Sequence, residues 1–122
     1  MNAAGALCVT REELEALGRS RAGAIVTKSM TLEPRQGNPE PRYRAFPGGS
    51  INSMGLPNLG YRAYAALIPE LKKFGKPVVA SVAGLAEDDF ITIATAINER
   101  APDLIEVNLS CPNIPGKPQI GY

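Results

Sequence analysis

The sequence predicts an α/β fold in which helices alternate with the strands of a parallel sheet. Segments with apolar residues at helical spacing alternate along the chain with short runs rich in β-branched residues. Polar residues also collect just after those runs, where ligands sit in parallel sheets. A hydrophobic content of 44% and a charged content of 20% are typical of a folded globular chain.

The first predicted helix covers about residues 11–19. Thr10 followed three residues later by Glu13 is the pattern of a capping box, and Leu14 and Leu17 then follow at helical spacing. The β-branched run after this helix ends in a lysine and predicts a strand over residues 23–28.

Residues 30–60 are predicted to form a long loop. Prolines and glycines are too frequent there for a helix or a central strand. They are Pro34, Gly37, Pro39, Pro41, Pro47, Gly48, Gly49, Gly55 and Pro57. A loop of this length inside a compact domain is usually functional.

The second helix is predicted where five side chains share one helical face, with a kink or restart at Pro69 and a stop at Gly75. These side chains are Tyr61, Tyr64, Ala65, Ile68 and Leu71. A strand over residues 76–84 follows.

The last two elements are a helix over residues 86–100 and a strand over residues 103–110. The helix has acidic residues in its first turn, at the positive end of the helix dipole. The strand alternates, so that Ile105, Val107 and Leu109 point one way while Glu106, Asn108 and Ser110 point the other.

Composition excludes several function classes. Thirteen basic and twelve acidic residues give a net charge of +1. Proteins that bind nucleic acid usually carry a clear excess of basic residues, so this function is not expected. No apolar stretch of about 18 residues and no signal peptide is present, so we expect no membrane span and a cytoplasmic location. The two cysteines, Cys8 and Cys111, are then expected to be free thiols. Zero histidines exclude Ser-His and Cys-His pairs and His-ligated metal, and no metal site is predicted.

Three stretches could carry chemistry, and each also has a structural interpretation. Lys28 either emerges from a sheet edge or aims a cation at an anion or an electron-rich ring. Residues 49–58 are either a turn rich in Asn and Gly or a set of convergent donors and acceptors. Cys111 is either structural or, with a thiol pKa near ~8.5, a proton acceptor that needs no histidine. Glu106 could pair with Lys28 across the sheet.

Five strings, in this order, resemble segments of the dihydroorotate dehydrogenases, specifically the soluble class 1A form. They are "NAAG" at 2–5, "TKS" at 27–29, "GNPEPRY" at 37–43, "GSINSMGLPNLG" at 49–60 and "NLSCPNIPGKPQ" at 108–119. The resemblance covers essentially the whole chain. The two long strings are highly specific, whereas "TKS" and "NAAG" alone are not.

The resemblance implies a (β/α)8 TIM barrel of which only about the first four β/α units are present. Residues 1–122 are then the N-terminal part of a single FMN-dependent barrel domain, and we expect a half barrel. The family's later strands, with the glycine-rich loops for the flavin phosphate, are missing from the sequence. The isolated chain is therefore expected to be inactive.

The resemblance also implies a reaction, namely the oxidation of dihydroorotate to orotate in pyrimidine (UMP) biosynthesis. FMN accepts the hydride, fumarate is the final electron acceptor, and the full-length form is a homodimer. Cys111 is then the catalytic base that removes a proton from substrate C5 while hydride leaves C6 for flavin N5. The implied substrate-binding residues are Lys28, Asn52, Met54, Gly55, Leu56, Asn108 and Asn113. The implied flavin contacts are Ala4, Gly5, Lys28, Ser29 and Asn108.

Two alternatives stay open. One is a flavin enzyme similar to dihydropyrimidine dehydrogenase, whose related cysteine loop does not continue as "NIPGKPQ". The other is a non-catalytic half-barrel interaction module.

Overall fold

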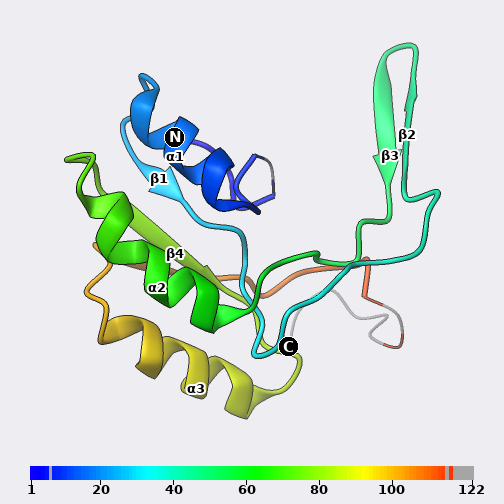
Figure 1. Ribbon diagram of the computed structural model, residues 1–122. Coiled ribbons are helices and arrows are strands. Elements are labelled where there is room, and N and C mark those ends of the chain that lie inside the picture. Colours follow the sequence, from blue (N-terminus) through cyan, green and yellow to red (C-terminus); the bar gives the residue numbers. More distant parts are fainter. Residues whose placement is uncertain (6, 115, 117–122) are drawn as a thin grey trace.

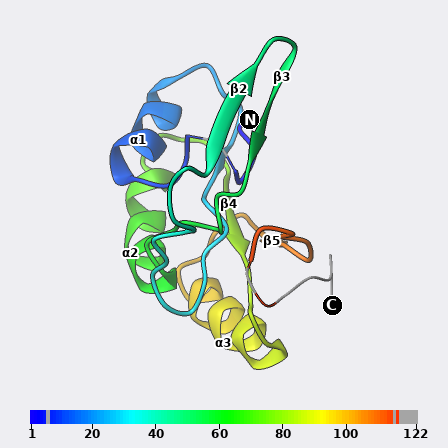
Figure 2. The same cartoon turned by 90° about the vertical axis from the view of Figure 1, so that its right-hand side faces the viewer.

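A three-stranded parallel sheet lies beneath three helices in the computed structural model, which describes residues 1–5, 7–114 and 116. The strands stand in the order β1 (Ile25–Val26), β4 (Val78–Val82) and β5 (Leu104–Val107). The helices are α1 (Arg11–Arg19), α2 (Tyr61–Lys72) and α3 (Glu87–Asn98), and all three lie on the same side of the sheet (Figures 1 and 2). The predicted alternation of helices with parallel strands is confirmed.

The two faces of the sheet differ in character. The face toward the helices carries Ile25, Val78 and Ala80, which are completely buried in the hydrophobic core. The opposite face carries the intervening residues of each strand. The parallel register pairs Ser81 of β4 with Glu106 of β5 on that face. The sheet therefore presents apolar residues to the helices, while its open side is mixed, with Val79 beside Leu104 and Ser81 beside Glu106.

Helix α1 begins at the predicted capping box. The Thr10 hydroxyl accepts a hydrogen bond from the backbone N–H of Glu13 at 3.2 Å, and the Glu13 carboxylate accepts from the Thr10 N–H at 3.0 Å. The same carboxylate accepts from the Val9 N–H at 2.7 Å. Donors that the helix itself leaves unpaired are thus satisfied, which explains why the helix begins here.

Helix α2 differs from its prediction at Pro69. Of the expected kink or restart, the restart is wrong, because a single helix spans Tyr61–Lys72 with Pro69 inside it, and the kink stays a prediction. Ile68 and Leu71, on either side of the proline, are both buried in the core. Their burial on one continuous face favours an uninterrupted helix over the local preference of proline. Gly75 follows with a φ of +67°, so the predicted stop is confirmed.

Strand β1 is shorter than the predicted strand because its pairing with β4 is interrupted by a bulge. The N–H of Thr27 donates to Val79 O, and the next ladder bond runs from the N–H of Met30 to Ser81 O. Three residue steps on one strand therefore match two on the other. The Thr27 hydroxyl fills the gap by accepting from the Ser81 N–H at 3.0 Å. A bulge redirects the side chains next to it, which here are Lys28 and Ser29.

The predicted long loop contains an antiparallel hairpin that the sequence reading missed. Strands β2 (Tyr43–Phe46) and β3 (Gly49–Asn52) pair with each other and project from the rest of the chain (Figure 1). Every residue of both strands is exposed, so the hairpin has no buried face. The alternation of apolar and polar residues that normally reveals a strand is therefore absent.

Asn58 anchors the chain where it returns from the hairpin to the body. Its buried amide oxygen accepts from the N–H groups of Thr31 and Gly60, at 3.1 and 2.8 Å. Its amide nitrogen donates to the Thr31 hydroxyl and to Leu56 O, both at 2.9 Å. Asn58 is therefore a structural residue that joins the two ends of the segment.

The two outer edges of the sheet differ: the backbone of β1 is hydrogen-bonded to the N-terminal segment, whereas β5 has exposed apolar side chains. The side chain of Asn2 pairs with Val26 as a strand would, accepting from its N–H at 2.9 Å and donating to its O at 2.8 Å. The Lys28 N–H, on the same edge, donates to Cys8 O. At the other edge, Leu104 and Val107 of β5 are exposed by 64% and 50%.

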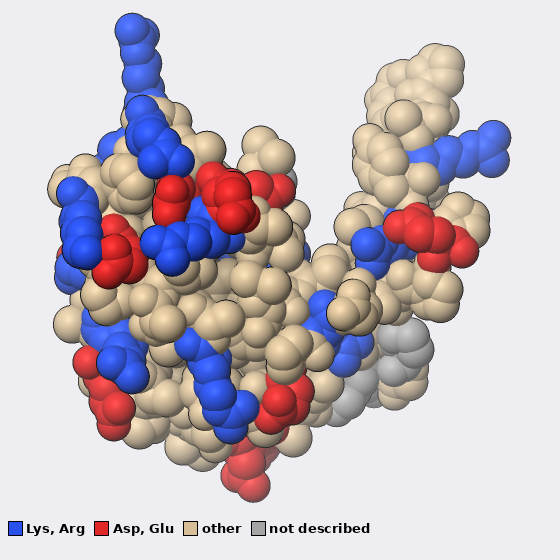
Figure 3. All heavy atoms as spheres, in the orientation of Figure 1, with Lys and Arg blue, Asp and Glu red and all other residues tan. Residues whose placement is uncertain are grey.

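Basic and acidic side chains are interspersed on the face of the molecule shown in Figure 3. Several form ion pairs within or between helical turns, such as Glu15 with Arg11 and Arg19. Of the helices that the structure describes, none is both long and apolar enough to cross a bilayer.

Candidate functional site

The polar residues that follow β1 and β5 lie at the same edge of the sheet, because both strands run parallel to β4. Lys28 is the most unusual of them. Only 8% of its surface is exposed, yet within the described part of the chain its ammonium group has no ion pair and no hydrogen bond. The ammonium nitrogen is not among the fully buried polar atoms, so the stem of Lys28 is buried while its charge reaches the surface at this edge, where a bound anion or carbonyl group can pair with it.

Ser29 and Asn108 are joined to each other at this edge and form part of a group that we name the strand-end cluster. Its members are Lys28, Ser29, Ser81, Glu106 and Asn108. The Asn108 amide donates to the Ser29 hydroxyl at 3.1 Å. The hydroxyls of Ser29 and Ser81 lie 2.9 Å apart, and Ser81 donates to the Glu106 carboxylate at 2.7 Å.

A second polar group, the hairpin-base cluster, holds the loop after β5 against the base of the hairpin. It consists of Asn38, Asn52, Ser53 and Asn113. The Asn113 amide donates to Asn52 Oδ1 at 3.2 Å, and Asn38 Nδ2 donates to Asn113 O at 2.9 Å. Asn38 Nδ2 also lies 3.0 Å from both Ser53 O and Ser53 Oγ. Two of the predicted substrate residues, Asn52 and Asn113, are thus brought together.

Cys111 lies on the loop that connects the two clusters, between Asn108 in one and Asn113 in the other. It is half-buried, and neither Cys111 nor the buried Cys8, whose Sγ–H donates to Ala3 O at 3.6 Å, belongs to a disulfide among the described residues. The expectation that the two cysteines form no disulfide is confirmed. Because both ends of its loop are tied by hydrogen bonds, the position of Cys111 is set by residues distant in sequence.

Met54, Gly55 and Leu56 lie between the hairpin and Asn58. Met54 O accepts from the Asn38 N–H at 2.9 Å, and Gly55 has a φ of +73°. A Cβ at Gly55 would collide with Asn38, so glycine is required by close approach as well as by conformation. Leu56 is 5% exposed and belongs to the buried hydrophobic residues.

Ala4 and Gly5 lie on the segment before α1, half-buried and exposed respectively. The bonds of Asn2 to Val26 and of Cys8 to Lys28 hold this segment along β1. Among the described residues, no hydrogen bond links Ala4 or Gly5 to Ser29 or Asn108. The segment therefore runs beside the strand-end cluster without a direct polar contact to those two residues.

Sequence reasoning did not select Asn38 or Ser81. Asn38 sits between Gly37 and Pro39 inside the predicted long loop, and Ser81 interrupts an apolar strand. A serine in a strand of buried apolar residues is the signal that could have been used, because a buried hydroxyl needs a partner. The expected pairing of Glu106 with Lys28 is wrong, since the carboxylate binds Ser81.

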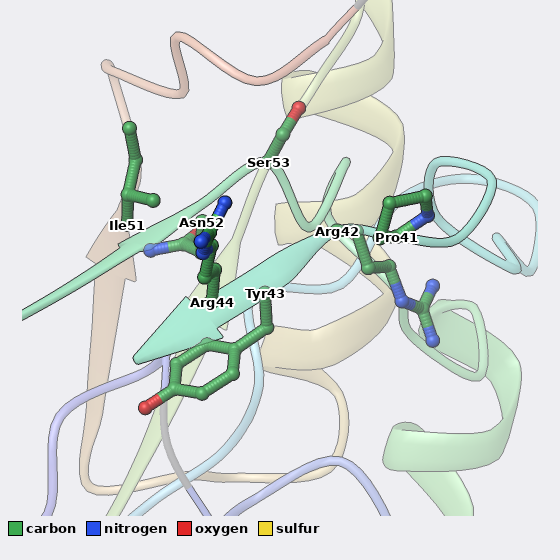
Figure 4. Close-up of a pocket in the computed structure, with 7 residues that line it drawn as sticks. All are labelled: Pro41, Arg42, Tyr43, Arg44, Ile51, Asn52 and Ser53. Carbon is green, nitrogen blue, oxygen red and sulfur yellow. The ribbon is translucent and has the colours of Figure 1, made fainter. Parts of the chain in front are cut away.

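A groove of about 310 Å³ runs along the hairpin itself. Its seven lining residues come from β2, β3 and their immediate flanks (Figure 4): Pro41, Arg42, Tyr43, Arg44, Ile51, Asn52 and Ser53. Asn52 and Ser53 also belong to the hairpin-base cluster. The remaining lining residues lie away from the sheet edge.

Comparison with known proteins identifies the family. The family model described as Dihydroorotate dehydrogenase matches residues 1–122. A protein of Trypanosoma cruzi named dihydroorotate dehydrogenase (fumarate) is 50% identical over 126 residues, covering 100% of this chain and 40% of that protein. A Trypanosoma brucei brucei protein of the same name is 48% identical over 128 residues, with the same coverage.

A solved structure agrees in fold. The crystal structure of ligand-free type DHODH from Eimeria tenella matches with a TM-score of 0.66 over 76% of this chain and 30% of that chain, at 20% identity. At that identity the likeness concerns the fold alone. The chain spans about 40% of the length of the curated relatives it matches. With its whole length matched by the family model, the chain belongs to the dihydroorotate dehydrogenase family.

Proposed function

We propose that residues 1–122 are the N-terminal part of an FMN-dependent (β/α)8 barrel that oxidises dihydroorotate to orotate in pyrimidine (UMP) biosynthesis. Fumarate is the final electron acceptor in this proposal, the protein is cytoplasmic, and the full-length form is a homodimer. Family membership supports the reaction, and the names of the relatives support the acceptor. Because the chain covers 40% of those relatives, we assign the activity to a longer protein and expect none from residues 1–122 alone.

The observation that carries the proposal is the position of Lys28, which holds its stem buried and its ammonium group, without a partner among the described residues, at the sheet edge. A fixed cation there suits the electron-rich carbonyl edge of a flavin and the carboxylate of the substrate. The neighbouring donors and acceptors, Ser29 and Asn108, suit the carbonyl and N–H groups of the same rings. The residues present therefore fit the ring systems of a flavin and a pyrimidine.

The reaction removes a proton from C5 and a hydride from C6 of the substrate, which creates the C5–C6 double bond of orotate. FMN, when bound, supplies the hydride acceptor that no side chain can provide. Cys111, as a thiolate, takes the proton from C5 and holds it on Sγ. Hydrogen bonds of Asn108 and Asn113 tie down the loop on both sides of Cys111, which limits where this sulfur can lie, and positioning of a base lowers the barrier to proton transfer.

The remaining residues bind and orient the two rings. We assign the substrate to Lys28, Asn52, Met54, Gly55, Leu56, Asn108 and Asn113. We assign the flavin to Ala4, Gly5, Lys28, Ser29 and Asn108. The link between Asn52 and Asn113 supports a shared role for those two amides.

A chimeric protein tests the proposal. Residues 1–122 would replace the corresponding segment of the Trypanosoma cruzi relative, which supplies the rest of the length. We expect the chimera to bind FMN and its flavin absorbance to bleach when dihydroorotate is added without oxygen. The substitution Cys111→Ser should leave FMN bound and slow bleaching by at least ~10²-fold, the lower range of general-base contributions.

Dihydrouracil, which lacks the carboxylate, is the matched control substrate and should bleach the flavin poorly. A chimera that binds FMN but is bleached equally well by both substrates would contradict the assignment to dihydroorotate. Unchanged bleaching in the Cys111→Ser chimera would remove Cys111 from the mechanism.

A further inference from the structure

Four side chains form a continuous line of hydrogen bonds across the open face of the sheet, and the proposed reaction uses only two of them. The line runs through Asn108, Ser29, Ser81 and Glu106, with separations of 3.1, 2.9 and 2.7 Å. Ser81 is completely buried and Ser29 is 2% exposed. Water therefore has little access to the middle of the line, and its hydroxyls depend on each other for partners.

The Glu106 carboxylate at one end of this line determines which group donates and which accepts in every hydrogen bond of the line. An ionised carboxylate can only accept, so the single hydroxyl proton of Ser81 is donated to Glu106. Ser81 can then only accept from Ser29, and the Ser29 proton is committed to that bond. Ser29 in turn accepts from the Asn108 amide.

The Asn108 amide is held in one orientation by two different partners. Its nitrogen donates to Ser29, and its oxygen accepts from the Ser110 N–H at 3.1 Å. An amide flip would bring its oxygen to Ser29 and its nitrogen to an N–H donor. Asn108 therefore has one N–H left to offer, and its orientation depends on a carboxylate two residues earlier in the chain.

The fold brings these groups together at specific points. Ser81 and Glu106 are directly opposite each other in the parallel register of β4 and β5. The bulge between Thr27 and Met30 turns Ser29 toward Ser81. Cross-strand pairs on one face are the units that stabilise a sheet, and here the pair is polar and continues to the site edge.

We propose that Glu106 and Ser81 are positioning residues that set the hydrogen-bond polarity of the ligand site. Through them Ser29 has no proton left to donate, and Asn108 turns one free N–H toward the site beside the remaining lone pair of its oxygen. The ligand edge recognised there carries an N–H beside a carbonyl oxygen, as the imide edge of a flavin or a pyrimidinedione does. The inference about the ligand rests on the proposed function, whereas the donor and acceptor roles along the line of hydrogen bonds depend on this chain alone.

Nuclear magnetic resonance of the 122-residue chain tests the line without any ligand. We expect nuclear Overhauser contacts between the Asn108 side-chain amide protons and the Ser29 β protons. Glu106→Leu and Ser81→Ala should shift the Asn108 amide resonances and weaken these contacts. Glu106→Gln should preserve them, because its amide oxygen can still accept. Glu99→Gln, which changes an exposed carboxylate at the end of α3, is the matched control and should change nothing.

Unchanged Asn108 resonances in both Glu106→Leu and Ser81→Ala would overturn the inference. Because Glu106 is exposed, its variants carry the test if Ser81→Ala does not fold. Recovery of the wild-type spectrum by Glu106→Gln distinguishes positioning from a general loss of stability.

The chimera with the Trypanosoma cruzi relative tests the consequence for ligand binding. Glu106→Leu should weaken FMN binding by about tenfold, which corresponds to about 1.4 kcal/mol, and Glu106→Gln should bind nearly as wild type. Shifted Asn108 resonances together with unchanged FMN affinity would overturn the ligand part of the inference. A wild-type chimera that binds no FMN, while the resonances respond as expected, would contradict the proposed function and leave the hydrogen-bond line intact.

Discussion

Tyr64 connects the hydrophobic core to the segment before α1 through one hydroxyl group. The side chain is completely buried, and its hydroxyl donates to Val9 O at 2.8 Å. Burial disfavours the charged phenolate and raises the pKa of Tyr64 to about 12. The folded state therefore holds this proton more tightly than the unfolded state does, where the pKa is close to ~10.

The raised pKa of Tyr64 predicts a loss of stability at alkaline pH. Above pH ~10 the unfolded chain releases the proton while the folded chain keeps it, so the free energy of unfolding falls as pH rises from about 10 to about 12. Below pH ~10 the contribution is fully present. Urea unfolding at a series of pH values measures this slope.

Tyr64→Phe is the control for the alkaline effect. It removes the titrating group and the bond to Val9, so it should be less stable at pH 7 but lose less stability between pH 10 and pH 12. Equal slopes in both proteins would show that the alkaline loss comes from other groups.

Helix α1 depends on its N-terminal cap because few of its residues are buried. Only Leu14 and Gly18 of its nine residues are buried, so packing contributes less here than in α2. The capping box compensates by satisfying the N–H groups of Val9, Thr10 and Glu13.

Thr10→Ala should therefore destabilise the chain by about 1 kcal/mol, the usual cost of losing a side-chain cap. Denaturant unfolding followed by circular dichroism measures the change. Thr92→Ala, at an exposed position inside α3, is the matched control and should change stability by less than ~0.5 kcal/mol. An equal effect of both substitutions would mean that the cap contributes nothing specific.

The whole sheet has one protected edge and one open edge. Asn2 and Cys8 occupy the backbone groups at the outer edge of β1. The edge strand β5 instead exposes apolar side chains, with Leu109 just beyond it exposed by 56%. Open apolar edges favour association with another chain. This tendency is the observation that favours the second candidate function, a non-catalytic interaction module.

Val107→Lys should lower concentration-dependent self-association of the 122-residue chain, because a charged side chain on an edge strand opposes pairing. Sedimentation velocity over a range of concentrations measures it. Ile91→Lys is the matched control, since Ile91 is 67% exposed but lies on α3, away from the edge. If Ile91→Lys reduces association as much as Val107→Lys does, the open edge is not the cause.

Local sequence patterns were sufficient to predict an element wherever residues close in the sequence determine its structure. The capping box at Thr10, the buried face of α2 and the alternation in β5 all depend on residues within a few positions of each other, and each predicted element is present. The strings around Lys28, Asn52 and Cys111 were sufficient to indicate the family, because such a resemblance is carried by consecutive residues and needs no tertiary contact.

Tertiary structure alone decided how the polar residues meet. Asn108 and Ser29 are 79 residues apart, and Asn113 and Asn52 are 61 apart, so their contacts require the strand order β1-β4-β5 and the hairpin. The bulge after Thr27 and the uninterrupted helix through Pro69 arise for the same reason. Pairing with β4 and burial in the core outweigh the local preferences of those residues, and no local pattern records such distant partners.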